Sequence, residues 1–222
     1  MCFSAEASFI AGSVLTVAGI ASIKKAGTRR QMMFASVPLL FAAQQFTEGV
    51  LWIVLPKPEY LGLQKLTTYT FLFFAQVVWP SWVPISVLLL EKDERRKKIL
   101  RLFSGIGLLV SCYLCFRLFT NHVYAEISDY HIHYDLGPVS VAARYFGVFY
   151  FIATAASPFI SGIKKLWIMG AAILSSYIIS FVFFHNNVIS VWCFFAAIIS
   201  VVIYFIIADL QKTIVPGDTL KN

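Results

Sequence analysis

Residues 71–119 hold the pattern that decides the fold: FLFFAQVVWPSWVPISVLLL (71–90), EKDERRKK (91–98) and ILRLFSGIGLLVSCYLCFRLF (99–119). Two apolar runs of about 20 residues flank one charged connector, and a helix of about 20 residues crosses a hydrocarbon layer of roughly 30 Å. In lipid, backbone N–H and C=O groups must be satisfied within the protein, and a helix does this within a single segment. This stretch therefore predicts two membrane-spanning helices joined by a short turn.

The same alternation recurs along the whole chain of 222 residues. It predicts one all-α domain, a seven-helix bundle with spans at about 5–23, 32–55, 66–90, 99–119, 141–160, 166–184 and 188–207. With 59% hydrophobic residues and a mean hydropathy of +0.77, a soluble fold would have more apolar surface than its charges can solvate. The sequence therefore predicts an integral membrane protein whose surroundings are membrane lipids.

The distribution of lysine and arginine predicts the orientation of the chain. Connectors after the first, third, fifth and seventh spans hold 14 of the 18 Lys and Arg residues, whereas the opposite connectors hold only Lys57 and Lys65. Basic connectors face the cytoplasm. We therefore expect an outer amino terminus and a cytoplasmic carboxyl terminus. The positive-inside pattern also explains the net charge of +7, and nucleic-acid binding is not expected.

Ionisable residues within the spans collect toward the predicted outer face. Glu48 lies seven residues before Leu55, about 10 Å inside the apolar layer at the helical rise of ~1.5 Å per residue. A carboxylate buried there costs several kcal/mol unless it is paired, protonated or hydrated, which makes it a candidate functional group. Gln44 is one turn below it on the same face. Arg117 and Arg144 reach a similar level, so either can neutralise Glu48.

These residues predict a polar pocket that opens to the outer face and binds a small molecule or a lipid headgroup, for transport or sensing. Glu48 is its central charge, Arg117 or Arg144 its counter-charge, and Gln44, Glu6 and His185 are further contacts. The alternative is that the Glu–Arg pair only links helices. A structural partner subunit without its own activity is a further possibility, because the sequence contains no recognisable catalytic motif.

All four histidines also fall on the predicted outer side: His122, His131, His133 and His185. His131 and His133 point the same way if their segment is extended. Together with His185 they predict a possible zinc site, which Glu48, Asp129, Asp135 or Cys2 can complete. With Glu48 as general base, the site would make the protein a metal-dependent lipid hydrolase. The His-Glu-x-x-His motif is absent, so the reaction, if there is one, stays open.

Three short stretches carry a family resemblance: MCFSAEASF (1–9), QQFTEG (44–49) and WCFFAA (192–197). They resemble a family of small bacterial multi-pass membrane proteins of unassigned function. The resemblance implies a bacterial inner-membrane protein and brings no catalytic residues. All three stretches lie toward the predicted outer face, which adds Cys2 and Trp192 to the candidate pocket.

Overall fold

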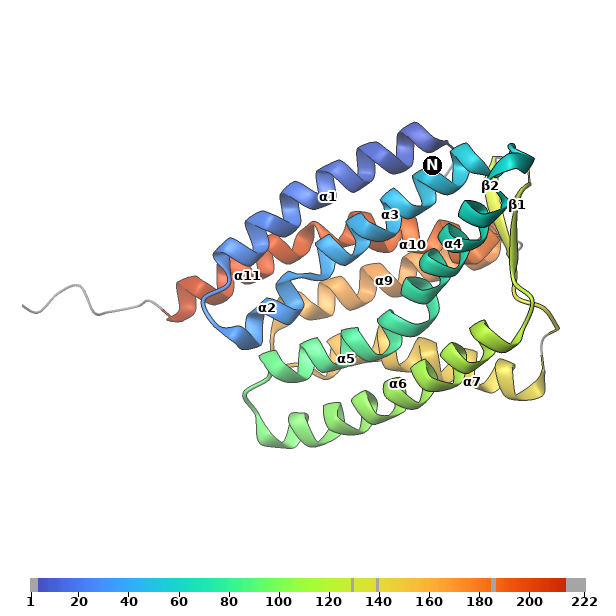
Figure 1. Ribbon diagram of the computed structural model, residues 1–222. Coiled ribbons are helices and arrows are strands. Elements are labelled where there is room, and N and C mark those ends of the chain that lie inside the picture. Colours follow the sequence, from blue (N-terminus) through green and yellow to red (C-terminus); the bar gives the residue numbers. More distant parts are fainter. Residues whose placement is uncertain (1–3, 129, 139, 185–186, 215–222) are drawn as a thin grey trace, which may run out of the picture.

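The computed structural model describes residues 4–128, 130–138, 140–184 and 187–214, and nearly all of its elements are helices (Figure 1). In chain order they are α1 (Ala5–Lys25), α2 (Arg29–Ala35), α3 (Val37–Val54), the 3-10 turn η1 (Pro58–Tyr60), α4 (Leu61–Leu72), the π-helix η2 (Phe73–Val78), α5 (Trp79–Leu90), α6 (Glu94–Thr120), β1 (Tyr124–Ser128), β2 (His131–Asp135), α7 (Val141–Phe151), the π-helix η3 (Ile152–Ala156), α8 (Ser157–Ile160), α9 (Lys164–Phe183), α10 (Val188–Ser200) and α11 (Val202–Ile214).

Six helical segments of the described chain are long and apolar enough to cross a membrane: Ala5–Lys25, Arg29–Val54, Pro58–Leu90, Glu94–Thr120, Lys164–Phe183 and Val188–Gln211. The chain is therefore a helical protein of the multi-pass membrane type. The predicted count of seven is not confirmed. The segment 141–160 is helical throughout but is not among the six, and it contains Arg144 together with Ser157 and Pro158.

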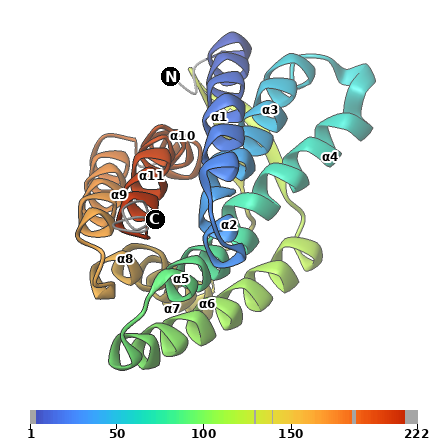
Figure 2. The same cartoon turned by 90° about the vertical axis from the view of Figure 1, so that its left-hand side faces the viewer.

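Successive long segments run in opposite directions, so the turns at 26–28, 91–93 and 161–163 gather at one end of the molecule (Figure 1). We call this the basic end, because the Lys and Arg clusters of the sequence flank these turns. The opposite end carries β1 and β2 and is called the hairpin end. Figure 2 looks along the helices from the basic end, with α1–α4 at the upper right, α9–α11 at the left and α5–α8 along the bottom.

Charged residues next to the apolar runs are helical as well, so several helices extend beyond the predicted spans. Polar side chains cap the amino termini of these helices by accepting hydrogen bonds from backbone N–H groups of the first turn. Asp93 accepts a hydrogen bond from the Arg96 N–H at 2.9 Å at the start of α6, five residues before the predicted span. Ser4 and Ser140 cap α1 and α7 in the same way.

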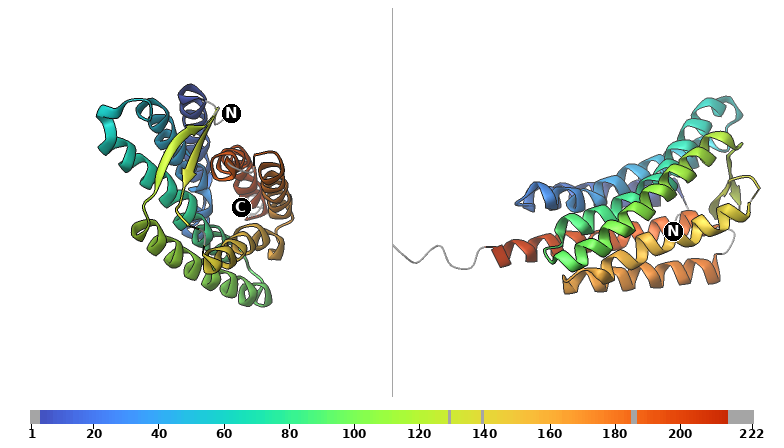
Figure 3. Two further views of the ribbon diagram at one scale, coloured as in Figure 1. Left: turned by 90° about the vertical axis from the view of Figure 1, so that its right-hand side faces the viewer. Right: turned by 90° about the horizontal axis from the view of Figure 1, so that it is seen from below.

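The expectation of an all-α fold is wrong in one place, the connector between α6 and α7. Strands β1 and β2 pair there as an antiparallel hairpin, with Tyr124 opposite Asp135 and Ser128 opposite His131. Figure 3 shows the hairpin lying across the hairpin end of the bundle. Ile132 and Tyr134 are buried and alternate with more exposed neighbours, which is the pattern of a strand with one face on the protein. This alternation of buried and more exposed side chains is typical of a β-strand and not of a loop.

The third apolar run is not a continuous α-helix, because the π-helix η2 joins α4 to α5. Prolines cannot donate the helical hydrogen bond and therefore free the carbonyl four residues earlier. Pro84 frees the carbonyl of Pro80, and α6 approaches this point so closely that a Cβ at Gly107 would overlap the Pro80 oxygen. Gly107 is therefore required for the close packing of α6 on α5.

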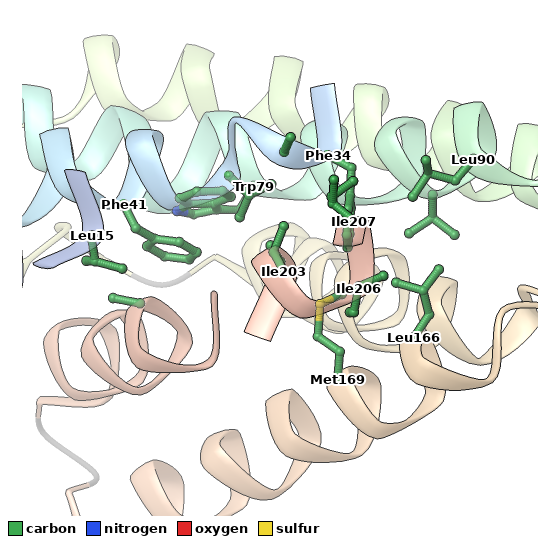
Figure 4. Close-up of a cluster of buried hydrophobic side chains, with 14 of the residues drawn as sticks. Leu15, Phe34, Phe41, Trp79, Leu90, Leu166, Met169, Ile203, Ile206 and Ile207 are labelled. Carbon is green, nitrogen blue, oxygen red and sulfur yellow. The ribbon is translucent and has the colours of Figure 1, made fainter. Parts of the chain in front are cut away.

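The main apolar core lies between α2, α3, α5, α9 and α11 (Figure 4). Trp79 stacks on Phe41 with ring centroids 3.9 Å apart, and Phe34, Ile203, Ile206 and Ile207 are almost completely buried beside them. A second cluster lies at the hairpin end, where Phe71 stacks on Tyr134 at 4.7 Å. This contact fixes β2 on the bundle.

One carboxylate links two turns at the basic end. Glu91 is only 6% exposed and accepts hydrogen bonds from the N–H groups of Lys92 and Asp93 at 2.8 and 3.0 Å. Its other oxygen accepts from the Ser161 hydroxyl at 2.9 Å and the Gly162 N–H at 2.7 Å. The turn after α5 is thereby fixed to the turn before α9.

Candidate functional site

The polar face of α3 is completely buried. Gln44, Gln45 and Glu48 each have 0% exposure, although they lie in a segment that is apolar enough to cross a membrane. Gln44 and Glu48 are one helical turn apart, so their side chains project on one side of α3. The helix therefore turns these polar residues into the protein, together with buried apolar residues such as Phe41 and Leu51.

Hydrogen bonds from two other helices fix this polar cluster. The Ser190 hydroxyl, on α10, lies 2.6 Å from Glu48 Oε1, and the indole N–H of Trp79, on α5, donates to Gln44 Oε1 at 2.9 Å. The Gln45 amide nitrogen is 3.5 Å from the second Glu48 oxygen. Glu48 and Gln44 thus connect α3 with α10 and α5, which is a structural role whatever else they do.

Neither arginine forms the predicted ion pair with Glu48. Arg117 is half-buried in the last turn of α6, and its Nη2 donates to the Pro138 carbonyl at 2.9 Å. Arg144 is exposed in the first turn of α7. Among the described residues no ion pair joins either one to Glu48. The reason lies in the packing: α6 contacts α5 and α7, whereas α3 contacts α1 and α10.

A cavity of about 300 Å³ lies at the hairpin end, between α6, α7, α9 and α10, and we call it the hairpin-end cavity. Arg117 lines it together with Asn121 and Gln76. Its wall also carries four aromatic rings, those of Tyr150, Phe151, Tyr177 and Trp192. Of the predicted pocket residues, the structure therefore brings Arg117 and Trp192 together around one space, while Glu48 and Arg144 do not line it.

A second, smaller cavity of about 60 Å³ lies deeper among the apolar side chains and is called the central cavity. Its lining is mainly apolar and includes Phe41, Trp79 and Ile203. The two cavities share three wall residues, Tyr150, Trp192 and Cys193.

The shared wall is built from aromatic contacts and one hydrogen bond. Trp192 meets the edges of Tyr150 and Tyr177, with centroid distances of 5.8 and 5.2 Å. The Tyr150 hydroxyl donates to the Ala75 carbonyl at 2.7 Å, within the π-helix η2. The Trp192 indole nitrogen is buried and has no hydrogen-bond partner among the described residues. An unpaired buried N–H costs about 1–3 kcal/mol, so this donor favours an acceptor nearby.

Sequence reasoning did not identify Tyr150, Tyr177 or Gln76. A tyrosine within an apolar run is a weak signal, since aromatic residues are common in such runs. The hydroxyl of Tyr150 has a specific partner only because η2 presents a carbonyl to α7, and that geometry depends on tertiary packing.

Three of the predicted metal ligands, His131, His133 and Asp135, lie in strand β2 of the hairpin. His131 and His133 occupy alternate positions of β2 and therefore face the same side, as expected of an extended segment. Asp135 accepts a hydrogen bond from the Gly137 N–H at 2.7 Å. A hydrogen bond from Tyr124, followed by the one from Gly137, lowers the pKa of Asp135. In the part of the chain that the structure describes, no group of three His, Cys, Asp or Glu side chains is placed to hold a metal.

The remaining candidates lie at the edge of the described chain or beyond it. Glu6 is exposed in the first turn of α1. Cys2, Asp129 and His185 fall outside the described residues, so the structure places none of them.

Comparison with known proteins identifies the family. A family of unknown function, DUF6629, matches residues 1–215, and the chain belongs to it. No curated protein and no solved structure matches the chain.

Proposed function

We propose that this member of the DUF6629 family is a membrane protein that binds a small anionic molecule or a lipid headgroup in the hairpin-end cavity, for transport or sensing. Arg117 carries the proposal. Its guanidinium has five N–H donors, and one of them donates to the Pro138 carbonyl. No carboxylate pairs with it among the described residues. A half-buried, unpaired positive charge in a cavity wall is the feature an anion would complement.

The size and the lining of the cavity support this assignment. A volume of about 300 Å³ is at the lower end of the range for small-molecule sites, which is roughly 300–1,000 Å³. Such sites combine aromatic walls with a few polar groups, and here Arg117, Asn121 and Gln76 are the polar groups.

Glu48 has a different part in this proposal from the one the sequence suggests. It lies in the buried cluster beside Cys193, which forms part of the cavity wall. Through its contact with Ser190 on α10, we expect it to hold Trp192 and Cys193 in position. Glu48 would then affect binding indirectly, through the position of α10.

We propose further that the hairpin end lies outside the cytoplasm, with the chain in a plasma membrane and the segment 141–160 as a seventh span. The positive-inside distribution of Lys and Arg supports this orientation. In this orientation the cavity faces outward, and membrane lipids surround the apolar helix faces. No observation favours the metal-dependent hydrolase or the structural subunit over a binding site.

The test uses the full chain, purified in mild detergent and studied by native mass spectrometry. We expect the wild type to retain an organic mass after detergent is stripped. Arg117→Gln should lose that mass. Arg144→Gln is the matched control, since Arg144 is an exposed arginine of the same end that does not line the cavity, and it should keep the mass.

A wild-type chain without bound mass, or equal retention by both variants, would overturn the proposal. Binding is the step that transport and sensing share. Uptake of the identified compound by vesicles containing the protein would separate the two, because only a transporter moves the compound across the membrane.

A further inference from the structure

The side chains that line the two cavities differ: those of the hairpin-end cavity include a charged group, and those of the central cavity are mainly apolar. Arg117, Asn121 and Gln76 line only the hairpin-end cavity, and the aromatic pair Tyr150 and Trp192 lines both cavities. Beyond this pair the central cavity is lined mainly by apolar side chains, with Ser200 among its few polar residues. A molecule that fills both spaces must therefore be charged at one end and apolar at the other.

We propose that the ligand is a single-chain anionic amphiphile, whose carboxylate or phosphate binds Arg117 while the end of its chain enters the central cavity past Tyr150 and Trp192. This inference rests on the proposed function, because it names the class of ligand for the same site. A wholly polar ligand would leave the aromatic walls in contact with water. A wholly apolar ligand would leave the Arg117 charge and the Trp192 N–H unpaired.

The volume of the central cavity limits how much of the ligand's alkyl chain it accommodates. The central cavity, at about 60 Å³, has roughly the volume of two water molecules at ~30 Å³ each, which leaves room for about two methylene groups. Each buried methylene tightens binding about fourfold. The affinity should therefore rise with chain length over a limited range and then level off.

Alkyl phosphates from ethyl to octyl, and alkyl carboxylates of the same lengths, are the probes. Their dissociation constants are measured by calorimetry on the full chain in lipid nanodiscs. We expect about a fourfold gain per methylene until the central cavity is full, and no gain after that. A preference for phosphate would indicate lipid headgroups or phosphate esters, and a preference for carboxylate would indicate free fatty-acid-like molecules.

The variant Ser200→Leu fills the central cavity and leaves the hairpin-end cavity unchanged. Ser200 is 2% exposed and donates only within its own helix, to the Ala197 carbonyl at 2.6 Å, so its loss leaves no partner helix without a donor. We expect roughly 15-fold weaker binding of octyl phosphate, equivalent to two methylenes at fourfold each, and unchanged binding of ethyl phosphate. Partition of the probes into lipid is the same for the wild type and the variant, so its contribution cancels when their dissociation constants are compared.

Ala143→Leu is the matched control, because Ala143 lines only the hairpin-end cavity. The larger side chain should weaken the binding of all probes by the same factor. If Ser200→Leu does not fold, Ser200→Val makes the same test with a smaller side chain. Equal effects of the Ser200 variant on ethyl and octyl phosphate would refute the amphiphile. Arg117-dependent binding without chain-length dependence would refute only this inference, whereas the absence of any Arg117-dependent binding would refute the proposed function as well.

Discussion

The carboxylate of Glu91 offers the most direct test of how the basic end is held together, through the substitution Glu91→Gln. The native side chain accepts four hydrogen bonds, two from the N–H groups of its own turn and two from Ser161 and Gly162 across the bundle. A glutamine has the same shape but only one acceptor oxygen. Its NH₂ group would face two donors and could accept from neither.

The expected loss of stability in Glu91→Gln follows from these hydrogen bonds. A hydrogen bond to a charged acceptor contributes about 1.5–3 kcal/mol, so the loss of two predicts a destabilisation of about 3–6 kcal/mol. Folded domains have roughly 5–15 kcal/mol of stability in total, so the effect should be large. The measurement is the unfolding transition of the purified protein in detergent, followed by circular dichroism. Glu94→Gln is the matched control, since Glu94 is exposed and near in the chain, and its loss should change little.

The pH dependence gives a second readout of the same carboxylate. Burial raises the pKa of Glu91, but the hydrogen bonds from Asp93, Gly162, Lys92 and Ser161 outweigh it, and the net pKa lies below the ordinary value. The stabilisation by Glu91 is therefore complete above the pKa of an unfolded glutamate and is lost as the pH falls through the lowered folded pKa. The difference in stability between the wild type and Glu91→Gln should narrow on acidification. Unfolding of Glu91→Gln at the same denaturant concentration as Glu94→Gln at neutral pH would refute this account.

Two further substitutions test the helix packing with the same unfolding assay. Gly107→Ala should destabilise the protein by about 2 kcal/mol or more, because a Cβ there overlaps the Pro80 carbonyl, whereas Gly105→Ala meets open space and should have no such cost. Equal unfolding stability of these two variants would mean that α6 does not pack closely on α5. Ser190→Ala removes the 2.6 Å contact with Glu48 and should cost about 1–3 kcal/mol, and an unchanged stability would show that this contact does not hold α10 to α3.

Much of the helical architecture follows from the sequence alone, because the membrane signal is local. A run of about 20 apolar residues predicts a helix whatever its neighbours are, and six of the predicted spans coincide with helices that are long and apolar enough to cross a membrane. The segment 141–160 is helical as well, yet its composition leaves the seventh span a prediction. Polar residues within an apolar run also indicate a buried face, and Gln44 and Glu48 are buried on α3.

The sequence predicts less about the partners of each polar group. Arg117 and Glu48 lie at a similar predicted depth, which suggested a pair, but depth does not determine which helices are neighbours. The extended segment 131–135 is recognisable as a strand only once Ile132 and Tyr134 are seen to pack on the bundle, where Phe71 stacks on Tyr134.

The sequence by itself determined the membrane class of the protein, the positions of most helices, the clustering of basic residues at one end and the family. These properties depend on composition along short stretches, which lipid and backbone hydrogen bonding convert directly into helices. Only the tertiary structure decided that Arg117 lines a cavity, that Tyr150 and Trp192 line two cavities at once, and that Glu48 contacts Ser190. Each of these depends on which faces of distant helices meet, and that is set by close packing across the bundle and not by the order of residues within one helix.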